Sequence, residues 1–158
     1  MLIVNASPLI FLGNANLLTL LNSIDDEIVV AHSAFEEVTK SLHSDLAKNA
    51  AKNASWLIRK SCSVIPTPIL AWDLGFGESE VLALGLQARS ATLVLDDLAA
   101  RRCALSLGLK VMGTLGIVVA GHRRGLISDP LQVIEQLRSG GMWLSEAVVK
   151  QVRALAGI

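Results

Sequence analysis

The fold is decided by one stretch of the chain, residues 92–116, which reads TLVLDDLAARRCALSLGLKVMGTLG. The stretch opens on a short run with the length and apolar content of a fully buried strand, and Asp96 and Asp97 follow directly. Residues 98–107 then read as a helix, and residues 110–112 as another buried strand. Two strands separated by one helix predict a parallel pair joined by a helical crossover.

The same alternation of strands and helices runs through the rest of the chain. Apolar runs at residues 2–4, 27–31 and 64–65 predict further strands, and the alanine-rich residues 45–59 predict a long helix. No repeat, low-complexity tract or linker interrupts the pattern. We therefore expect a single domain over residues 1–158, a three-layer α/β/α fold whose central sheet is mostly parallel.

The composition restricts where the protein works and what it binds. Apolar residues make up 52% of the chain and charged residues 18%, so we expect a second copy to cover part of the apolar surface, as in a homodimer. Acidic and basic residues number 14 each, so no overall positive field steers the protein to nucleic acid, although a local basic patch is compatible with this balance. Cys62 and Cys103 fit no metal-ligand spacing, and the sequence shows no signal peptide or membrane span. We expect a cytoplasmic protein with reduced thiols.

Polar side chains follow three of the expected strands at the point where each strand ends. Asn5 follows the first strand, Asp96 and Asp97 follow the strand of residues 92–95, and Thr114 follows the next one. Because the carboxyl ends of parallel strands meet at one edge of a sheet, we expect these side chains to border a common crevice.

Two expected helices bring further carboxylates to this edge. Ser33 and Glu36 have the spacing of a capping box, which leaves Glu37 free for a site, and Glu78 and Glu80 lie in the first turn of another helix. Carboxylates gathered from separate elements repel each other unless a cation lies among them. Hard oxygen ligands of this kind suit Mg²⁺ or Mn²⁺, so the pattern favours a site for one of these ions.

Each of these acids also has a purely structural interpretation. Glu78 and Glu80 would complement the dipole of the helix in which they begin, and an aspartate that follows a strand often caps the next helix. With two aspartates in succession, one of Asp96 and Asp97 can cap while the other faces the crevice. These alternatives stay open for each residue taken alone.

Four stretches, taken together, resemble the PIN domain, and more specifically the branch related to the VapC toxins of bacterial and archaeal toxin–antitoxin pairs. The resemblance covers nearly the whole chain and is most specific where strand, double aspartate, helix, strand and GTLG follow one another. The matching stretches are IVNASPLI (residues 3–10), GFGESEVLALGLQA (75–88), LVLDDLAARRCALSLGLKVMGTLGIVVAGHRRGLI (93–127) and GMWLSEAVVKQVRALAG (141–157).

This resemblance implies a Mg²⁺- or Mn²⁺-dependent endoribonuclease that acts as the toxin of a toxin–antitoxin pair, with RNA as its substrate and an antitoxin protein as its partner. The family's acids fall by position on Glu37, on Glu78 with Glu80 less favoured, and on Asp96 or Asp97. The Gly-Thr turn places Thr114 where its hydroxyl would orient a water or a phosphate.

The first-strand acid of the family falls on Asn5, and this is where the chain departs from the pattern. Asparagine keeps an oxygen that can bind a metal, but it carries no charge. Loss of even a residue that only supports a metal ligand commonly costs 10–100-fold in metal affinity or activity, so loss of a ligand carboxylate could cost at least as much. The alternative is therefore a weakened or inactive PIN-like module that binds RNA or protein. A different α/β enzyme such as a phosphatase is a third hypothesis, although the Asp-x-Asp of phosphoaspartyl chemistry is missing.

Overall fold

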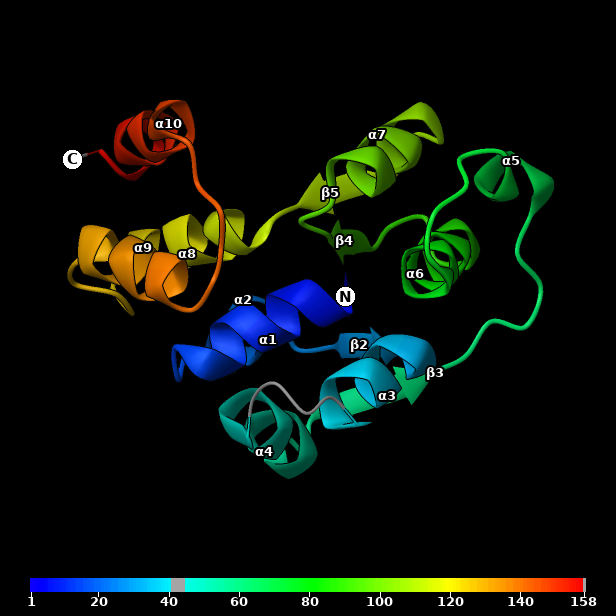
Figure 1. Cartoon of the computed structure of the whole chain (residues 1–158), viewed down its shortest axis with the longest axis horizontal. Coiled ribbons are helices and arrows are strands. Elements are labelled where there is room, and N and C mark those ends of the chain that lie inside the picture. The colour runs from blue at the N-terminus through cyan, green and yellow to red at the C-terminus, as the bar shows by residue number, and fades with distance from the viewer. Residues whose placement is uncertain (41–44, 158) are drawn as a thin grey trace.

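The computed structural model describes residues 1–40 and 45–157. Its centre is a five-stranded sheet in the order β3-β2-β1-β4-β5, and every neighbouring pair of strands is parallel. The predicted α/β fold with a parallel central sheet is confirmed (Figure 1). The strands are β1 (Leu2–Val4), β2 (Ile28–Ala31), β3 (Leu57–Lys60), β4 (Thr92–Val94) and β5 (Lys110–Met112).

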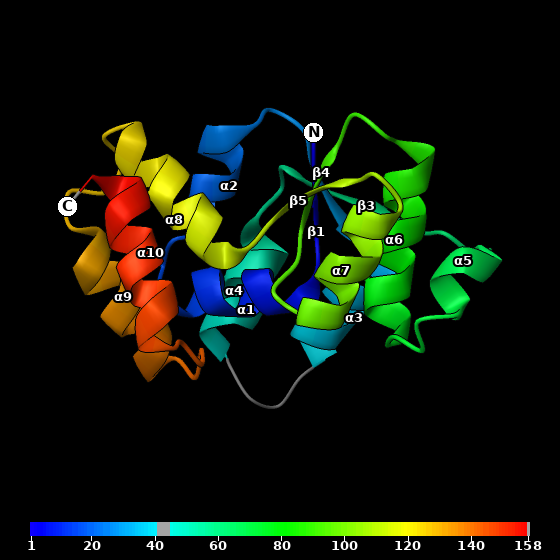
Figure 2. The same ribbon diagram turned by 90° about the horizontal axis from the view of Figure 1, so that it is seen from above.

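Helices cover both faces of the sheet, as the alternating pattern predicted. Figure 2 shows α6 and α7 on one side of the strands with α5 outside them, and α1, α2, α4 and α8 on the other side, where α9 and α10 pack onto α8. In the described part of the chain, no helix combines the length and the apolar character needed to cross a membrane. The helices are α1 (Ala6–Asn14), α2 (Thr19–Ile24), α3 (His32–Lys40), α4 (Asp45–Asn53), α5 (Thr67–Leu70), α6 (Phe76–Gln87), α7 (Leu98–Ser106), α8 (Thr114–Arg123), α9 (Pro130–Ser139) and α10 (Glu146–Ala156).

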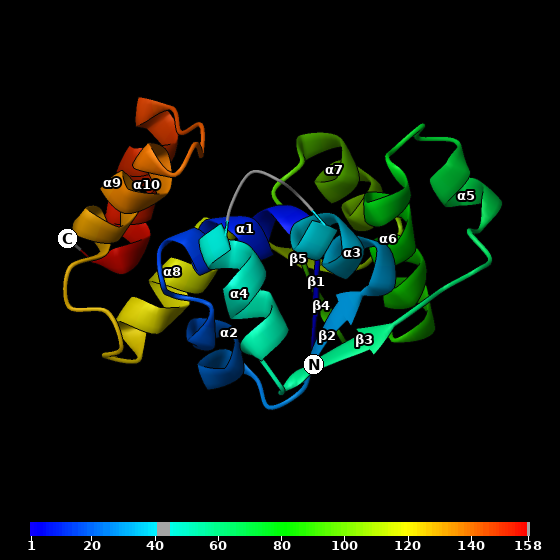
Figure 3. The same ribbon diagram turned by 60° about the horizontal axis from the view of Figure 1, so that its bottom comes forward.

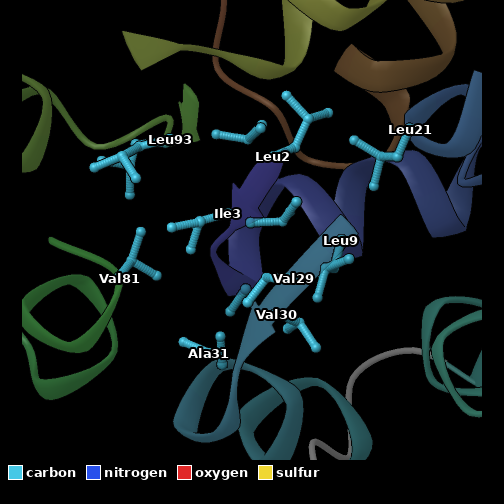
Figure 4. Close-up of a cluster of buried hydrophobic side chains, with 14 of the residues drawn as sticks. Leu2, Ile3, Leu9, Leu21, Val29, Val30, Ala31, Val81 and Leu93 are labelled. Atoms are coloured by element: carbon cyan, nitrogen blue, oxygen red, sulfur yellow. The ribbon is translucent and has the colours of Figure 1, made fainter. Parts of the chain in front are cut away.

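The core is built around β1 and β2, which are buried on both faces. A strand in this position needs apolar side chains at every residue, and this is why β1 and β2 read as continuous apolar runs. In Figure 4, Ile3 lies towards Val81 of α6 and Leu93 of β4, while Leu9 and Leu21 pack on the other side. The strand ends are therefore held rigidly from both layers.

The prediction was wrong in the region between α3 and α5. The expected long helix over residues 45–59 is the shorter α4, and the strand lies at Leu57–Lys60 rather than at residues 64–65. Because β3 is an edge strand in which only the first residue is buried, its sequence carries no apolar run. Its pairing with β2 and the guanidinium of Arg59, 3.7 Å from the centre of the Phe35 ring, hold it in place.

The strand order identifies the edge at which a site is expected. From β1 the chain moves outward to β2 and β3, and it then crosses back to β4 on the opposite side of β1. The crevice outside the carboxyl ends of β1 and β4 is therefore the topological switch point, where open α/β sheets bind their ligands. Asn5 and Asp96 lie on either side of this point, just after β1 and β4.

Candidate active site

Asn5 occupies the centre of this edge. It is buried, and its backbone N–H donates to the carbonyl of Val94 over 3.1 Å. Its side-chain Nδ2 donates to Oε1 of Glu78 over 3.2 Å. This bond fixes the amide, because the reverse orientation would place an oxygen against a carboxylate. The buried Oδ1 of Asn5 then has no hydrogen-bond donor among the residues that the structure describes.

The unpartnered oxygen of Asn5 and two other side-chain oxygen atoms border the space that Gly77 leaves open. A Cβ atom at Gly77 would lie 3.5 Å from Oδ1 of Asn5, 3.8 Å from Oγ of Ser33 and 3.9 Å from Oε2 of Glu37. These side chains come from the end of β1 and from α3, and α6 contributes Gly77 and Glu78. We call Asn5, Ser33, Glu37 and Glu78 the oxygen cluster.

Electrostatic repulsion is present within the oxygen cluster. Glu37 is exposed overall, but partial burial of its carboxyl and the nearby carboxylate of Glu78 raise its pKa above its ordinary value. A cation bound beside Glu37 would oppose this repulsion and favour the ionised form of Glu37.

Glu80 has a different environment, although it lies only two residues from Glu78. Only 2% of its surface is exposed, and its carboxylate accepts hydrogen bonds from the backbone N–H of Ser33 over 2.9 Å, from the Ser33 hydroxyl, and from the backbone N–H of Cys62 over 3.0 Å. Glu80 therefore joins α6 to the start of α3 and to the segment after β3. Of the two acids, Glu78 is the one that bonds to Asn5 and belongs to the oxygen cluster.

The predicted capping box at Ser33 and Glu36 is wrong. Helix α3 begins at His32, so Ser33 lies inside the helix rather than before it. Its hydroxyl donates to Glu80, and the carboxylate of Glu36 pairs with Lys40. Ser33 was missed as a residue of the site because its spacing from Glu36 suggested a local role.

The two aspartates after β4 divide their roles. Oδ1 of Asp97 accepts the backbone N–H of Ala100 over 2.8 Å, so Asp97 is the exposed N-cap of α7. Asp96 instead reaches the start of α8, where its Oδ1 accepts the N–H of Thr114 over 2.8 Å and its Oδ2 accepts the Thr114 hydroxyl over 2.6 Å. One aspartate caps its own helix, and the other faces the neighbouring strand end.

Arg101 places a positive charge beside Asp96. Its Nη1 donates to the carbonyl of Leu95 over 3.3 Å, close to the backbone of Gly113. Burial raises the pKa of Asp96, while the hydrogen bonds from Thr114 and the guanidinium of Arg101 act in the opposite direction. The sequence shows Arg101 only as a basic residue of a helix, and it did not indicate that Arg101 would lie beside Asp96.

The structure therefore gathers some of the predicted metal ligands and not others. Asn5, Glu37 and Glu78 lie together, whereas Asp96 and Asp97 bond to the starts of α8 and α7. Within residues 1–40 and 45–157, no three His, Cys, Asp or Glu side chains are close enough to hold a metal ion by themselves. The oxygen cluster still fits Mg²⁺ or Mn²⁺, because it offers two carboxylates, a hydroxyl and a buried amide oxygen without a donor.

Comparison with known proteins adds one match. A family model described as a PIN domain matches residues 1–158. No curated protein matches the chain. PIN domains are generally nucleases, and such nucleases generally use divalent metal ions.

Proposed function

We propose that this chain, which belongs to the PIN domain family, is a Mg²⁺- or Mn²⁺-dependent endoribonuclease. The observation that supports this most is the buried Oδ1 of Asn5, which lacks a donor among the described residues and borders the same space beside Gly77 as Oε2 of Glu37. A buried acceptor without a partner is costly, and it is retained most readily where a ligand completes it.

The oxygen cluster would hold the cation through Asn5, Glu37 and Glu78. When bound, the cation would supply a Lewis acid that stabilises negative charge at phosphorus and eases deprotonation of the attacking water. The Nδ2 of Asn5 also holds the Glu78 carboxylate in position, so that this carboxylate and Oδ1 of Asn5 have a fixed arrangement for binding the cation. The hydroxyl of Ser33 is the remaining oxygen group of the cluster, and Glu80 holds it in position.

The second side of the crevice would orient the RNA. Asp96 holds both the N–H and the hydroxyl of Thr114, and it therefore fixes the start of α8 next to the end of β4. The guanidinium of Arg101 provides a positive charge there that would attract a phosphate. Asp97 keeps one carboxylate oxygen beyond its bond to Ala100, and this exposed group would supply a further oxygen ligand at the rim of the crevice.

We propose further that the protein is a toxin and that a segment of an antitoxin protein covers part of its surface. Exposed apolar side chains between β3 and α6, namely Val64, Leu70 and Trp72, provide a surface that a partner would bury. Self-association as a homodimer would cover further apolar surface, in keeping with the low charge content of the chain. Light scattering across micromolar concentrations tests the dimer, which a strict monomer would contradict.

A second candidate is a PIN-like module that binds RNA without cutting it. The hydrogen bond from Asn5 to Glu78 favours this reading, because a neutral amide holds one of the two carboxylates without any cation. Such a module would bind RNA equally well in EDTA and would show no turnover with Mn²⁺.

RNA cleavage by matched variants separates the two functions. Glu37→Gln removes a carboxylate from the oxygen cluster, and Glu36→Gln, one residue earlier and paired with Lys40, is its control. The proposal predicts cleavage that needs Mg²⁺ or Mn²⁺, falls at least 100-fold in Glu37→Gln and persists in Glu36→Gln, on the order expected when a metal ligand is lost. Cleavage that survives both EDTA and Glu37→Gln would refute it.

A further inference from the structure

A surface segment with few buried residues follows β3. Residues 61–66 belong to neither a helix nor a strand, and Figure 3 shows the chain running from β3 past α6 to α5. Among these residues only Cys62 is buried. A stretch with so few buried contacts belongs to the part of a protein that opens at low free energy, so a single hydrogen bond contributes much of its attachment.

A chain of hydrogen bonds leads from this segment to the oxygen cluster. The backbone N–H of Cys62 donates to Oε1 of Glu80 over 3.0 Å, and the Ser33 hydroxyl donates to the other oxygen, Oε2. The oxygen of that hydroxyl borders the space beside Gly77, 3.8 Å from the position of a Cβ atom there. The two oxygens of one buried carboxylate therefore hold the segment on one side and a member of the oxygen cluster on the other.

Cys62 extends this chain to the protein surface. Its thiol donates to the carbonyl of Val64 over 3.2 Å and accepts from Nε2 of Gln87 on α6 over 3.3 Å. The side chain of Val64 is 74% exposed and is part of the apolar surface to which the proposed antitoxin segment would bind. An exposed apolar residue is thus joined to the site through Cys62, Glu80 and Ser33.

The effect of a cation on this chain follows from its donors and acceptors. Ser33 donates its one hydroxyl proton to Glu80, so a lone pair of the hydroxyl oxygen is left to bind a cation. Binding draws electrons from that oxygen and makes its O–H a stronger donor, because hydrogen bonds in a chain polarise one another. The carboxylate of Glu80 is then held more firmly in the position in which its Oε1 accepts from Cys62.

We propose that binding of a divalent cation at the oxygen cluster and attachment of residues 61–66 are linked through Ser33 and Glu80, so that each strengthens the other. Linkage of this kind is reciprocal, because both events act on one equilibrium. The link rests on the proposed metal site and adds its regulation. A partner that moves this segment by binding Val64 changes the affinity for the cation without entering the crevice.

Hydrogen–deuterium exchange of the full chain, followed by mass spectrometry with and without Mg²⁺, tests the link. Calorimetry first gives the dissociation constant of Mg²⁺ for each variant. Detachment of a group that supports a metal ligand commonly costs 10–100-fold in affinity, so Mg²⁺ at ten times the dissociation constant should slow exchange of residues 61–66 about 5–10-fold. Exchange of α10, which packs on α8 and α9, should not change.

Ser33→Ala removes the hydroxyl at a position where alanine suits the helix. It is expected to bind Mg²⁺ through the other three residues of the cluster with about 10-fold lower affinity. At ten times its own dissociation constant, Mg²⁺ should then leave exchange of residues 61–66 unchanged. Ser23→Ala is the control and should behave as the parent, because Ser23 is also a helical serine, whose hydroxyl donates to the carbonyl of Thr19.

The outcomes separate this link from the proposed nuclease function. Slower exchange in the parent and in Ser23→Ala, but not in Ser33→Ala, supports the link. If the parent binds Mg²⁺ and exchange of residues 61–66 does not slow, or slows equally in Ser33→Ala, the link is refuted and the metal site stands. If calorimetry shows no binding of Mg²⁺ to the parent, the metal site and the link both fail.

Discussion

Glu80→Gln is the substitution that best separates structural from catalytic carboxylates in this fold. The Glu80 side chain is 2% exposed and accepts hydrogen bonds from two donors on Ser33 and from the N–H of Cys62. Glutamine keeps one acceptor oxygen and turns an NH₂ group towards donors that need an acceptor. Each buried donor left without a partner costs about 1–3 kcal/mol, so we expect Glu80→Gln to lose about 3 kcal/mol of unfolding free energy.

Thermal unfolding followed by circular dichroism measures this loss. For a domain of this size about 3 kcal/mol corresponds to a decrease in Tm of about 6–12 °C. Glu78→Gln is the matched control on the same helix, and its Tm should change little, because Glu78 accepts one hydrogen bond, from the Asn5 amide, within residues 1–40 and 45–157. If Glu80→Gln unfolds at the parent's temperature and yet abolishes metal binding, then Glu80 is a ligand and the assignment of Glu78 is wrong.

Three further substitutions probe the site from other directions. Glu37→Gln should stabilise the metal-free protein at neutral pH by less than about 1 kcal/mol after solvent screening, because the pKa of Glu37 is raised in the folded state. That gain should vanish below about pH 4, where the acid is protonated in both states, and a gain independent of pH in urea titrations would contradict it. Gly77→Ala should fold at least as well as the parent, since the new Cβ meets only ordinary contacts, but should lose Mn²⁺ binding in calorimetry because the methyl group fills the space beside Asn5. Thr114→Val removes the hydroxyl that donates to Asp96, so we expect a loss of about 1–3 kcal/mol and a further rise in the pKa of Asp96; an unchanged Tm would show that this bond does not anchor α8.

The sequence predicted most of the sheet, for a physical reason that also explains the exception. Strands β1, β2 and β4 are buried, so that nearly every residue must be apolar, and this requirement is visible in one sequence. Strand β3 lies at the edge with one buried residue, and its polar side chains suggested the end of a helix. Its place in the sheet depends on pairing with β2 and not on its own composition.

The candidate site was predictable in its location but not in its detail. The positions of Asn5, Asp96 and Thr114 after three strands predicted that they lie at one edge of the sheet. This holds in the structure because the carboxyl ends of parallel strands all lie at the same edge. The roles of Glu78 and Glu80 could not be separated, since both begin the same helix and only contacts with Ser33, 47 residues away, distinguish them. Gly77 also shapes the site, because the absence of a side chain there leaves space beside Asn5. No pattern in the sequence indicates this role.

Calorimetric titration with Mn²⁺ shows whether Asn5, Glu37 and Glu78 hold a divalent cation. The parent should bind one ion, and Glu78→Gln should abolish binding. Asn5→Asp adds a carboxylate next to Glu78 and Glu37, so it should tighten binding about 10–100-fold while lowering the Tm of the metal-free protein through repulsion. If the parent binds no Mn²⁺, or binds it as well as Glu78→Gln does, then the oxygen cluster is not a metal site and the proposed metal-dependent cleavage is wrong.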